Sequence, residues 1–179
     1  PWLGADKRIV MLQPRRIAAR AVARRLSQLA GSEPGQLVGY RTRLETRVSA
    51  ATRIEVVTEG ILARRLQSDP ALEDVGCVIF DEFHERNLQS DLGLALALDA
   101  QRHLRDDLRL LVMSATLDGA AVAMVLGDAG SVRSEGRAFD VATQYAAPAP
   151  AGVNRWPELI EQRAARVVLR VLESDPGDV

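Results

Sequence analysis

The 179 residues are enough for one full domain, or for one domain and part of another. The contents of 47% hydrophobic and 26% charged residues are ordinary for a soluble globular protein. No apolar run approaches the ~20 residues of a membrane span, and we expect no signal peptide before the first strand. The formal net charge of −1 excludes a global basic field, so any nucleic-acid binding must come from local arginines.

The chain begins with a predicted strand and helix. Arg8 to Leu12 is a short apolar strand, and Pro14 after it suits the first turn of a helix that is predicted from Arg15 to Ala30. The face of this helix that packs on the sheet is expected to contain Ala18, Val22, Leu26 and Leu29. Arg15 and Arg16 lie at the carboxyl edge of the strand, beside a helix N-terminus that favours anions. We therefore predict that these two arginines contact phosphate.

Two further segments precede the most informative part of the chain. Val38 to Arg43 is short and alternates in polarity, and Arg53 to Val57 is predicted to be a strand. Thr58 then opens a helix, and Thr58 as an N-cap with Glu59 against the helix dipole explains this start without any function. Gly60, an unfavourable helix residue, instead suggests that something approaches the backbone closely at this point.

An acidic segment follows the most apolar run of the sequence. Val75 to Phe80 is typical of a strand buried on both faces, as in a parallel sheet, and contains the single cysteine. Ligands of open α/β sheets bind beyond the carboxyl ends of the strands, where Asp81, Glu82 and His84 stand. One carboxylate there can hold Mg²⁺ while its neighbour orients a water for attack on a phosphoryl group. A solvated acidic turn is the alternative interpretation.

The single cysteine, Cys77, excludes a disulfide framework and a cysteine metal site, and it fits a reducing cytoplasm. Leu88 to His103 is predicted to be a helix, and Arg109 to Met113 a strand. Ser114 and Thr116 come directly after that strand. Their hydroxyls are ordinary capping groups or have a second role one strand away from the acidic pair.

The character of the sequence changes after Gly130. Phe139 to Val141 is a candidate short strand, and Ala146 to Gly152 has the composition of a linker. An amphipathic helix is predicted to begin at Pro157. We expect a first domain over residues 1–141, a linker over 142–153 and the truncated beginning of a second domain over 154–179.

The order of these motifs resembles the first RecA-like domain of DEAH-box ATP-dependent helicases, and most of all the bacterial HrpB type. Any one motif is weak evidence, but five in family order are specific. The matching segments are Gln13-Pro14-Arg15-Arg16-Ile17-Ala18-Ala19-Arg20, Val38-Gly39-Tyr40, Thr58-Glu59-Gly60, Asp81-Glu82-Phe83-His84-Glu85-Arg86 and Ser114-Ala115-Thr116. The fold class expected is therefore α/β, with a RecA-like parallel sheet flanked by helices.

The resemblance implies a role for each matching position, with ATP as substrate and Mg²⁺ as cofactor. Asp81 would hold Mg²⁺ and Glu82 would activate the attacking water. His84 would couple the nucleotide state to strand separation, together with Ser114 and Thr116. The nucleic acid, expected to be RNA, would contact the residues Arg15, Arg16, Arg43, Thr58 and Gly60.

One departure from the family pattern limits this interpretation. The sequence has no Gly-X-X-X-X-Gly-Lys-Ser/Thr segment, and no glycine-rich loop precedes its only lysine, Lys7. We therefore expect a cytoplasmic fragment of a helicase that is not a competent ATPase by itself. A non-catalytic nucleic-acid-binding module that retains helicase-like motifs is one alternative. Another phosphate-handling α/β ATPase without strand-separation activity is the other.

Overall fold

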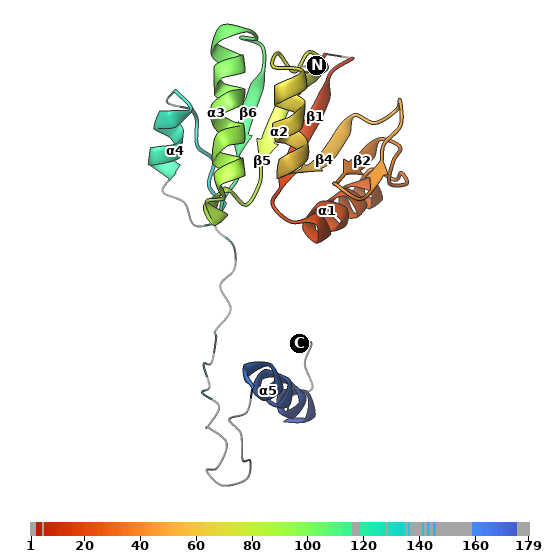
Figure 1. Ribbon diagram of the computed structural model, residues 1–179, viewed down its shortest axis with the longest axis vertical. Helices are drawn as coiled ribbons and strands as arrows, with labels where there is room; N and C mark the ends of the chain where they lie inside the picture. Colours follow the sequence, from red (N-terminus) through yellow and green to blue (C-terminus); the bar gives the residue numbers. More distant parts are fainter. Residues whose placement is uncertain are drawn as a thin grey trace. The chain divides into compact units, whose positions relative to one another are not determined.

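The computed structural model describes residues 3–4, 6–115, 119–127, 129–134, 136, 141, 143, 145 and 159–174. The chain divides into two compact units, Pro1–Val132 and Arg133–Val179. All of the sheet belongs to the first unit (Figure 1). No helix among the described residues is both long enough and apolar enough to cross a membrane.

Strands and helices alternate through the first unit. In chain order they are β1 (Arg8–Gln13), α1 (Arg16–Leu29), β2 (Val38–Arg41), β3 (Thr46–Arg47), β4 (Ile54–Thr58), α2 (Glu59–Ser68), β5 (Val75–Phe80), the short 3-10 helix η1 (Phe83–Glu85), α3 (Leu88–His103), β6 (Arg109–Val112) and α4 (Gly119–Val125). The strands form one sheet in the order β3-β2-β4-β1-β5-β6, parallel except for the β2–β3 pair. The predicted α/β fold with a parallel sheet flanked by helices is confirmed.

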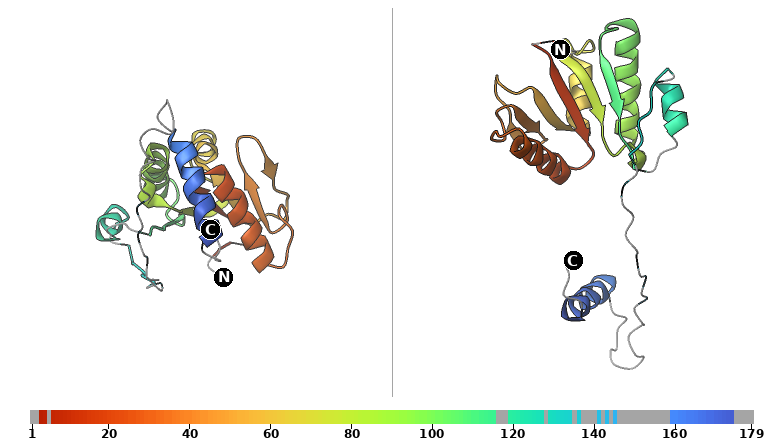
Figure 2. Two further views of the ribbon diagram at one scale, coloured as in Figure 1. Left: turned by 90° about the horizontal axis from the view of Figure 1, so that it is seen from below. Right: turned by 180° about the vertical axis from the view of Figure 1, so that it is seen from behind.

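The sheet separates two apolar layers. Helices α2 and α3 lie over one face and α1 over the other, as the opposite views in Figures 1 and 2 show. The larger layer joins α2 and α3 to β1 and β5 and includes Leu12, Leu62 and Phe80, each almost completely buried. Full burial of a side chain of this size contributes roughly 1.5–3 kcal/mol. β1 and β5 therefore lie at the centre of the most heavily packed part of the domain.

Helix α1 packs on the sheet through a face that only partly matches the predicted one. The fully buried apolar positions are Ala19 and Ala23, whereas Leu29 is 67% exposed. Val22 and Leu26 pack at the side of this layer, against Val38, Tyr40 and Val56 of the sheet. Ala19 and Ala23 share this layer with Tyr40 of β2, which is almost fully buried. The buried face of α1 is thus centred on the two small residues and excludes Leu29.

The two-residue strand β3 was not predicted. It pairs with β2 in an antiparallel hairpin, with Tyr40 opposite Arg47. Gly39 allows this approach, because a Cβ at that position would lie against the carbonyl oxygen of Arg47 and 2.9 Å from a methyl group of Val48. The Tyr40 hydroxyl donates a 2.5 Å hydrogen bond to Glu45 in the connecting turn. The hairpin covers the outer edge of β2.

A buried carboxylate joins four elements of the first unit. Glu55 of β4 has no exposed surface, and it faces arginines from β1, β2 and α2. Its oxygens lie 2.8 Å from Nε of Arg41, 3.2 Å from Nη1 of Arg65 and 3.9 Å from Nη1 of Arg8. Asp74 shares two of these arginines, at 3.3 Å and 3.7 Å. Because removal of one partner of a buried ion pair leaves the others uncompensated, we expect Glu55 to be important for stability.

Replacement of Glu55 tests this arrangement. Glu55→Gln should lower the free energy of unfolding by about 3 kcal/mol in urea titrations, the low end for a buried pair because the three arginines keep partial solvent contact. Asp99→Asn is the matched control, since Asp99 pairs with His103 at an exposed site and such pairs contribute less than about 1 kcal/mol. Equal stability of the two variants would contradict the assignment.

The described part of the second unit contains helix α5 (Ile160–Ser174). It corresponds to the amphipathic helix that was predicted to begin at Pro157, although Pro157 itself lies outside the described residues. Ile160 and Val168 of its apolar side are exposed. The candidate strand at 139–141 and the linker at 142–153 fall almost entirely outside the described residues, so the predicted domain boundaries stay a prediction.

Candidate functional site

The carboxyl ends of the parallel strands meet at one edge of the sheet. Gln13 at the end of β1 is in register with Thr58 of β4, and Leu12 is in register with Phe80 of β5. The amide of Asp81 continues this pairing, because it donates a 3.2 Å hydrogen bond to the carbonyl oxygen of Leu12. Gln13, Thr58 and Asp81 are therefore side by side, although they come from distant parts of the sequence.

The acidic segment leaves the sheet in an unusual backbone conformation. Glu82 has φ 53° and ψ 34°, and Arg86 has φ 51° and ψ 48°, both in the left-handed region. Such a conformation costs about 1–2 kcal/mol for a residue with a Cβ. Between these two residues Phe83 is buried in the core and anchors η1. Asn87 then caps α3, since its side-chain oxygen accepts a 3.0 Å hydrogen bond from the amide of Gln89.

The carboxylate of Asp81 is held at both oxygens. Oδ1 accepts a 2.9 Å hydrogen bond from the amide of Glu82, and Oδ2 accepts one from the side-chain amide of Gln13. No three His, Cys, Asp or Glu side chains in the described ranges form a group able to hold a metal ion. Mg²⁺ commonly binds to one or two carboxylates together with waters and substrate phosphates. The carboxylate of Asp81 could hold Mg²⁺ in this way, with waters and the phosphates of a nucleotide as the other ligands.

His84 contacts two of the predicted segments at once. Its Nδ1 accepts a long, 3.4 Å hydrogen bond from the amide of Ala115, and its Nε2 lies 3.4 Å from a carboxylate oxygen of Glu82. In the neutral imidazole one nitrogen accepts and the other carries the proton. The Ala115 contact thus assigns the proton to Nε2, which directs an N–H group at Glu82.

The residues after β6 are brought to the acidic segment as predicted, but through the backbone. Met113 exchanges hydrogen bonds with Phe80 and Phe83, at 2.8 Å and 3.1 Å, and this extends the β5–β6 pairing beyond the strand. Ser114 is exposed at this point, and the amide of the next residue, Ala115, donates a hydrogen bond to His84. Thr116 lies outside the described residues, so its predicted role is not tested.

The β1–α1 turn is joined to the acidic segment by an ion pair. Nη2 of Arg15 lies 2.9 Å from Oε1 of Glu85, with 74% of the arginine side chain exposed. Arg15 is the N-cap residue of α1, and Arg16, the first residue of the helix, is exposed beside it. Arg43 is exposed in the turn between β2 and β3. The ion pair with Glu85 was not predicted.

The segment Thr58-Glu59-Gly60 forms the start of α2. Thr58 is the N-cap residue, but its side chain makes no capping hydrogen bond, which leaves the hydroxyl at the edge of the sheet. Glu59 accepts a 2.7 Å hydrogen bond from Ser90, so the segment is tied to α3. A Cβ on Gly60 would meet only Oε1 of Gln89, at 3.9 Å, among the described residues. The packing of the domain therefore does not require glycine at this position.

The predicted residues divide along the edge of the sheet. The residues at the ends of β2, β4 and β1, or in the turns and helix starts that follow them, were predicted to bind nucleic acid. They are Arg43, Thr58, Gly60, Arg15 and Arg16. The residues that follow β5 and β6 are Asp81, Glu82, His84 and Ser114, all assigned to ATP hydrolysis or coupling. The two halves meet between β1 and β5, at the Gln13–Asp81 and Arg15–Glu85 contacts.

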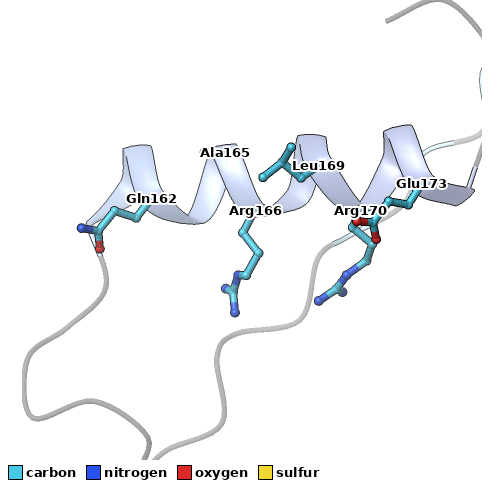
Figure 3. Close-up of a pocket in the computed structure, with 6 residues that line it drawn as sticks. All are labelled: Gln162, Ala165, Arg166, Leu169, Arg170 and Glu173. Atoms are coloured by element: carbon cyan, nitrogen blue, oxygen red, sulfur yellow. The ribbon is translucent and has the colours of Figure 1, made fainter.

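Two other features do not belong to this site. Burial raises the pKa of the Cys77 thiol inside β5, which keeps the sulfur protonated and unreactive. A surface pocket in the second unit is lined by residues of one helix, and none of the predicted site residues is among them (Figure 3). The lining residues are Gln162, Ala165, Arg166, Leu169, Arg170 and Glu173.

Comparison with known proteins agrees with this fold and this set of motifs. The family model described as DEAD/DEAH box helicase matches residues 3–125, which is more than half of the chain. The chain belongs to the DEAD/DEAH box helicase family.

Within this family the chain is similar to HrpB of Escherichia coli. It is 55% identical over 148 residues to the ATP-dependent RNA helicase HrpB of strain K12, a match that covers 83% of this chain and 18% of that protein. A crystal structure of the Escherichia coli DEAH/RHA helicase HrpB matches with a TM-score of 0.80 and 49% identity, over 95% of this chain and 21% of that one. The predicted RecA-like fold and the resemblance to the HrpB type are confirmed.

A plant relative shows how widely the segment is shared. The DExH-box ATP-dependent RNA helicase DExH1 of Arabidopsis thaliana is 41% identical over 142 residues, which cover 79% of this chain and 14% of that protein. The chain thus spans about a fifth or less of the length of these relatives.

Proposed function

We propose that this chain is the first RecA-like domain of a longer ATP-dependent RNA helicase of the bacterial HrpB type, with part of a second domain from residue 154. The observation that carries the proposal is the position of His84 between Glu82 and Ala115. A ring that contacts both the acidic pair and the segment after the next strand suits an enzyme that links hydrolysis to movement. The names of the HrpB and DExH1 relatives support RNA as the nucleic acid.

The acidic pair would perform the chemistry of ATP hydrolysis. Glu82, with 47% of its side chain exposed, would accept a proton from the attacking water. Asp81 would hold Mg²⁺, which supplies charge stabilisation for the transferred phosphoryl group. The left-handed backbone at Glu82 ends the extended conformation of β5 directly after Asp81. The two neighbouring acids can therefore serve different partners.

His84 would couple the protonation of Glu82 during hydrolysis to the position of the segment after β6. When Glu82 takes a proton, its attraction for the Nε2–H group of His84 weakens, and the contact of Nδ1 with the Ala115 amide changes with it. A single hydrogen bond contributes only about 0.5–1.5 kcal/mol, which is enough to bias a two-state element. Ser114 and Thr116 would couple this change in the two-state element to strand separation.

The other half of the sheet edge would bind the nucleic-acid backbone. Arg15, Arg16 and Arg43 would contact phosphates, and the Thr58 hydroxyl and the Gly60 backbone would complete the surface. Because exposed ion pairs are weak, an RNA phosphate can replace Glu85 as the partner of Arg15 at little cost. Nucleic-acid binding would then release Glu85 in the acidic segment.

The chain by itself would not hydrolyse ATP. It has no glycine-rich phosphate-binding loop, and positioning of the phosphates supplies nearly all catalysis of phosphoryl transfer. The chain covers about a fifth of the HrpB relative. This coverage supports a complete polypeptide that contains further segments. We expect that polypeptide to work in the cytoplasm.

Glu82→Gln in the complete polypeptide separates chemistry from binding. The amide keeps the shape of the side chain but cannot take a proton, so ATP and Mg²⁺ should still bind while phosphate release falls about 10²–10⁴-fold. Asp99→Asn, on the exposed surface of α3, is the control and should leave the turnover unchanged. Near-normal turnover by Glu82→Gln would place the base elsewhere.

Arg15→Ala combined with Arg16→Ala tests the nucleic-acid half of the edge. If both arginines contact phosphates, the slope of log affinity against log salt for single-stranded RNA should flatten by roughly 1.4. Arg20→Ala with Arg24→Ala removes the same charge from elsewhere on α1 and should change the slope less. Identical slopes for the wild-type polypeptide and both double variants would mean that Arg15 and Arg16 are solvated surface residues that do not contact phosphate.

A further inference from the structure

Gln13 is a buried polar residue without a role in the function proposed above. It ends β1 with only 1% of its surface exposed, and its neighbour Leu12 is fully part of the core. A buried amide costs free energy unless it is hydrogen-bonded, so an apolar residue would suit this position better for packing alone. The side chain instead donates to Oδ2 of Asp81, 68 positions further along the chain.

The contact restricts the carboxylate of Asp81 at the oxygen that the backbone does not hold. Oδ1 is held by the amide of Glu82 and Oδ2 by Gln13, so rotation of the carboxylate would break two hydrogen bonds. Each oxygen keeps a further lone pair for another ligand. Because the amide of Gln13 is neutral, it fixes this orientation without neutralising the negative charge. An arginine or lysine at the same place would compete with a cation.

Gln13 is also the point where the two halves of the sheet edge touch. It is in register with Thr58 on one side and contacts Asp81 on the other. Arg15, two residues later, makes the second contact across the same boundary. A shift of the β1–α1 turn would therefore move the donor that holds Asp81.

We propose that Gln13 is a positioning residue that acts through Asp81 and keeps its carboxylate oriented for Mg²⁺. This inference rests on the proposed ATP-dependent function. Gln13 itself needs no contact with nucleotide or metal. Loss of its N–H group frees the carboxylate to rotate, so that a cation must order it on binding, and a higher concentration of the cation is then required.

The test uses the complete polypeptide and the variant Gln13→Met, which keeps the length of the side chain and removes the donor. The affinity for Mn²⁺ in the presence of a non-hydrolysable ATP analogue is measured by electron paramagnetic resonance. We expect this affinity to fall about tenfold, and the Mg²⁺ concentration for half-maximal ATP hydrolysis to rise equally. Affinity for the nucleotide without divalent cation should stay unchanged.

Gln101→Met is the matched control. Its side-chain amide also donates to a partly buried acceptor, the carbonyl oxygen of Leu108, at 2.6 Å and away from the edge that carries Asp81. This variant should lose stability in urea and keep the wild-type Mn²⁺ affinity. If Gln13→Met does not fold, Gln13→Asn replaces it, because the shorter amide withdraws the donor but remains polar, and the same direction of change is expected.

Two results would overturn the inference, and they differ in what else they affect. If Gln13→Met or Gln13→Asn binds Mn²⁺ as the wild type does, Gln13 has only a structural role while the proposed function stands. If the wild-type polypeptide shows no nucleotide-dependent binding of Mn²⁺ at all, the proposed function fails together with this inference.

Discussion

The parallel pairing of β1 with β4 and β5 is the constraint on which the rest of the domain depends. Its register aligns the ends of three strands, and it places Gln13 between Thr58 and Asp81. The pairing is maintained by the large apolar layer under α2 and α3, and by the buried Glu55, which binds arginines of three other elements. A slip by one residue would reverse the faces of β1 and separate the site.

The acidic segment combines strain with anchoring. Two left-handed residues, Glu82 and Arg86, occur within five positions, and neither is a glycine. The conformation persists because Phe83 is buried between them and Asn87 caps the following helix. Strain of this kind often occurs at functional sites, where the surrounding packing is strong enough to hold the backbone in an unfavourable conformation. Here it stands between Asp81, which continues the pairing of β5, and the anchored helix η1.

Much of the first unit could be predicted from local pattern. β5 and α3 have the predicted bounds, since a continuous apolar run and a capped helix are strong local signals. β3 was missed because two residues carry no periodicity. They form a strand only by pairing with Tyr40 and Arg41 of β2, and Gly39 leaves room for their close approach. The α1 face was placed too far toward Leu29, because the spacing of large apolar residues gave no weight to the small Ala19 and Ala23, which are the buried ones.

The sequence motifs indicated the residues of the candidate site, but not the hydrogen bonds and ion pairs between them. The motifs indicated Asp81, Glu82 and His84, whereas the partners of Asp81 and Arg15 depend on which strands are neighbours. The contact from Ala115 uses a backbone amide, and every residue except proline has one, so side-chain chemistry gives no signal for it. Gln13 carried a weak signal, as a polar residue at the end of an apolar strand.

The central claim is that the two halves of the sheet edge belong to one RNA-dependent ATPase. Phosphate release, measured in parallel for this 179-residue chain and for the complete polypeptide, with and without single-stranded RNA, tests it most directly. The account predicts RNA-stimulated release from the complete polypeptide and none from the chain alone. A complete polypeptide that binds RNA without any stimulated release would contradict the account and favour a non-catalytic binding module.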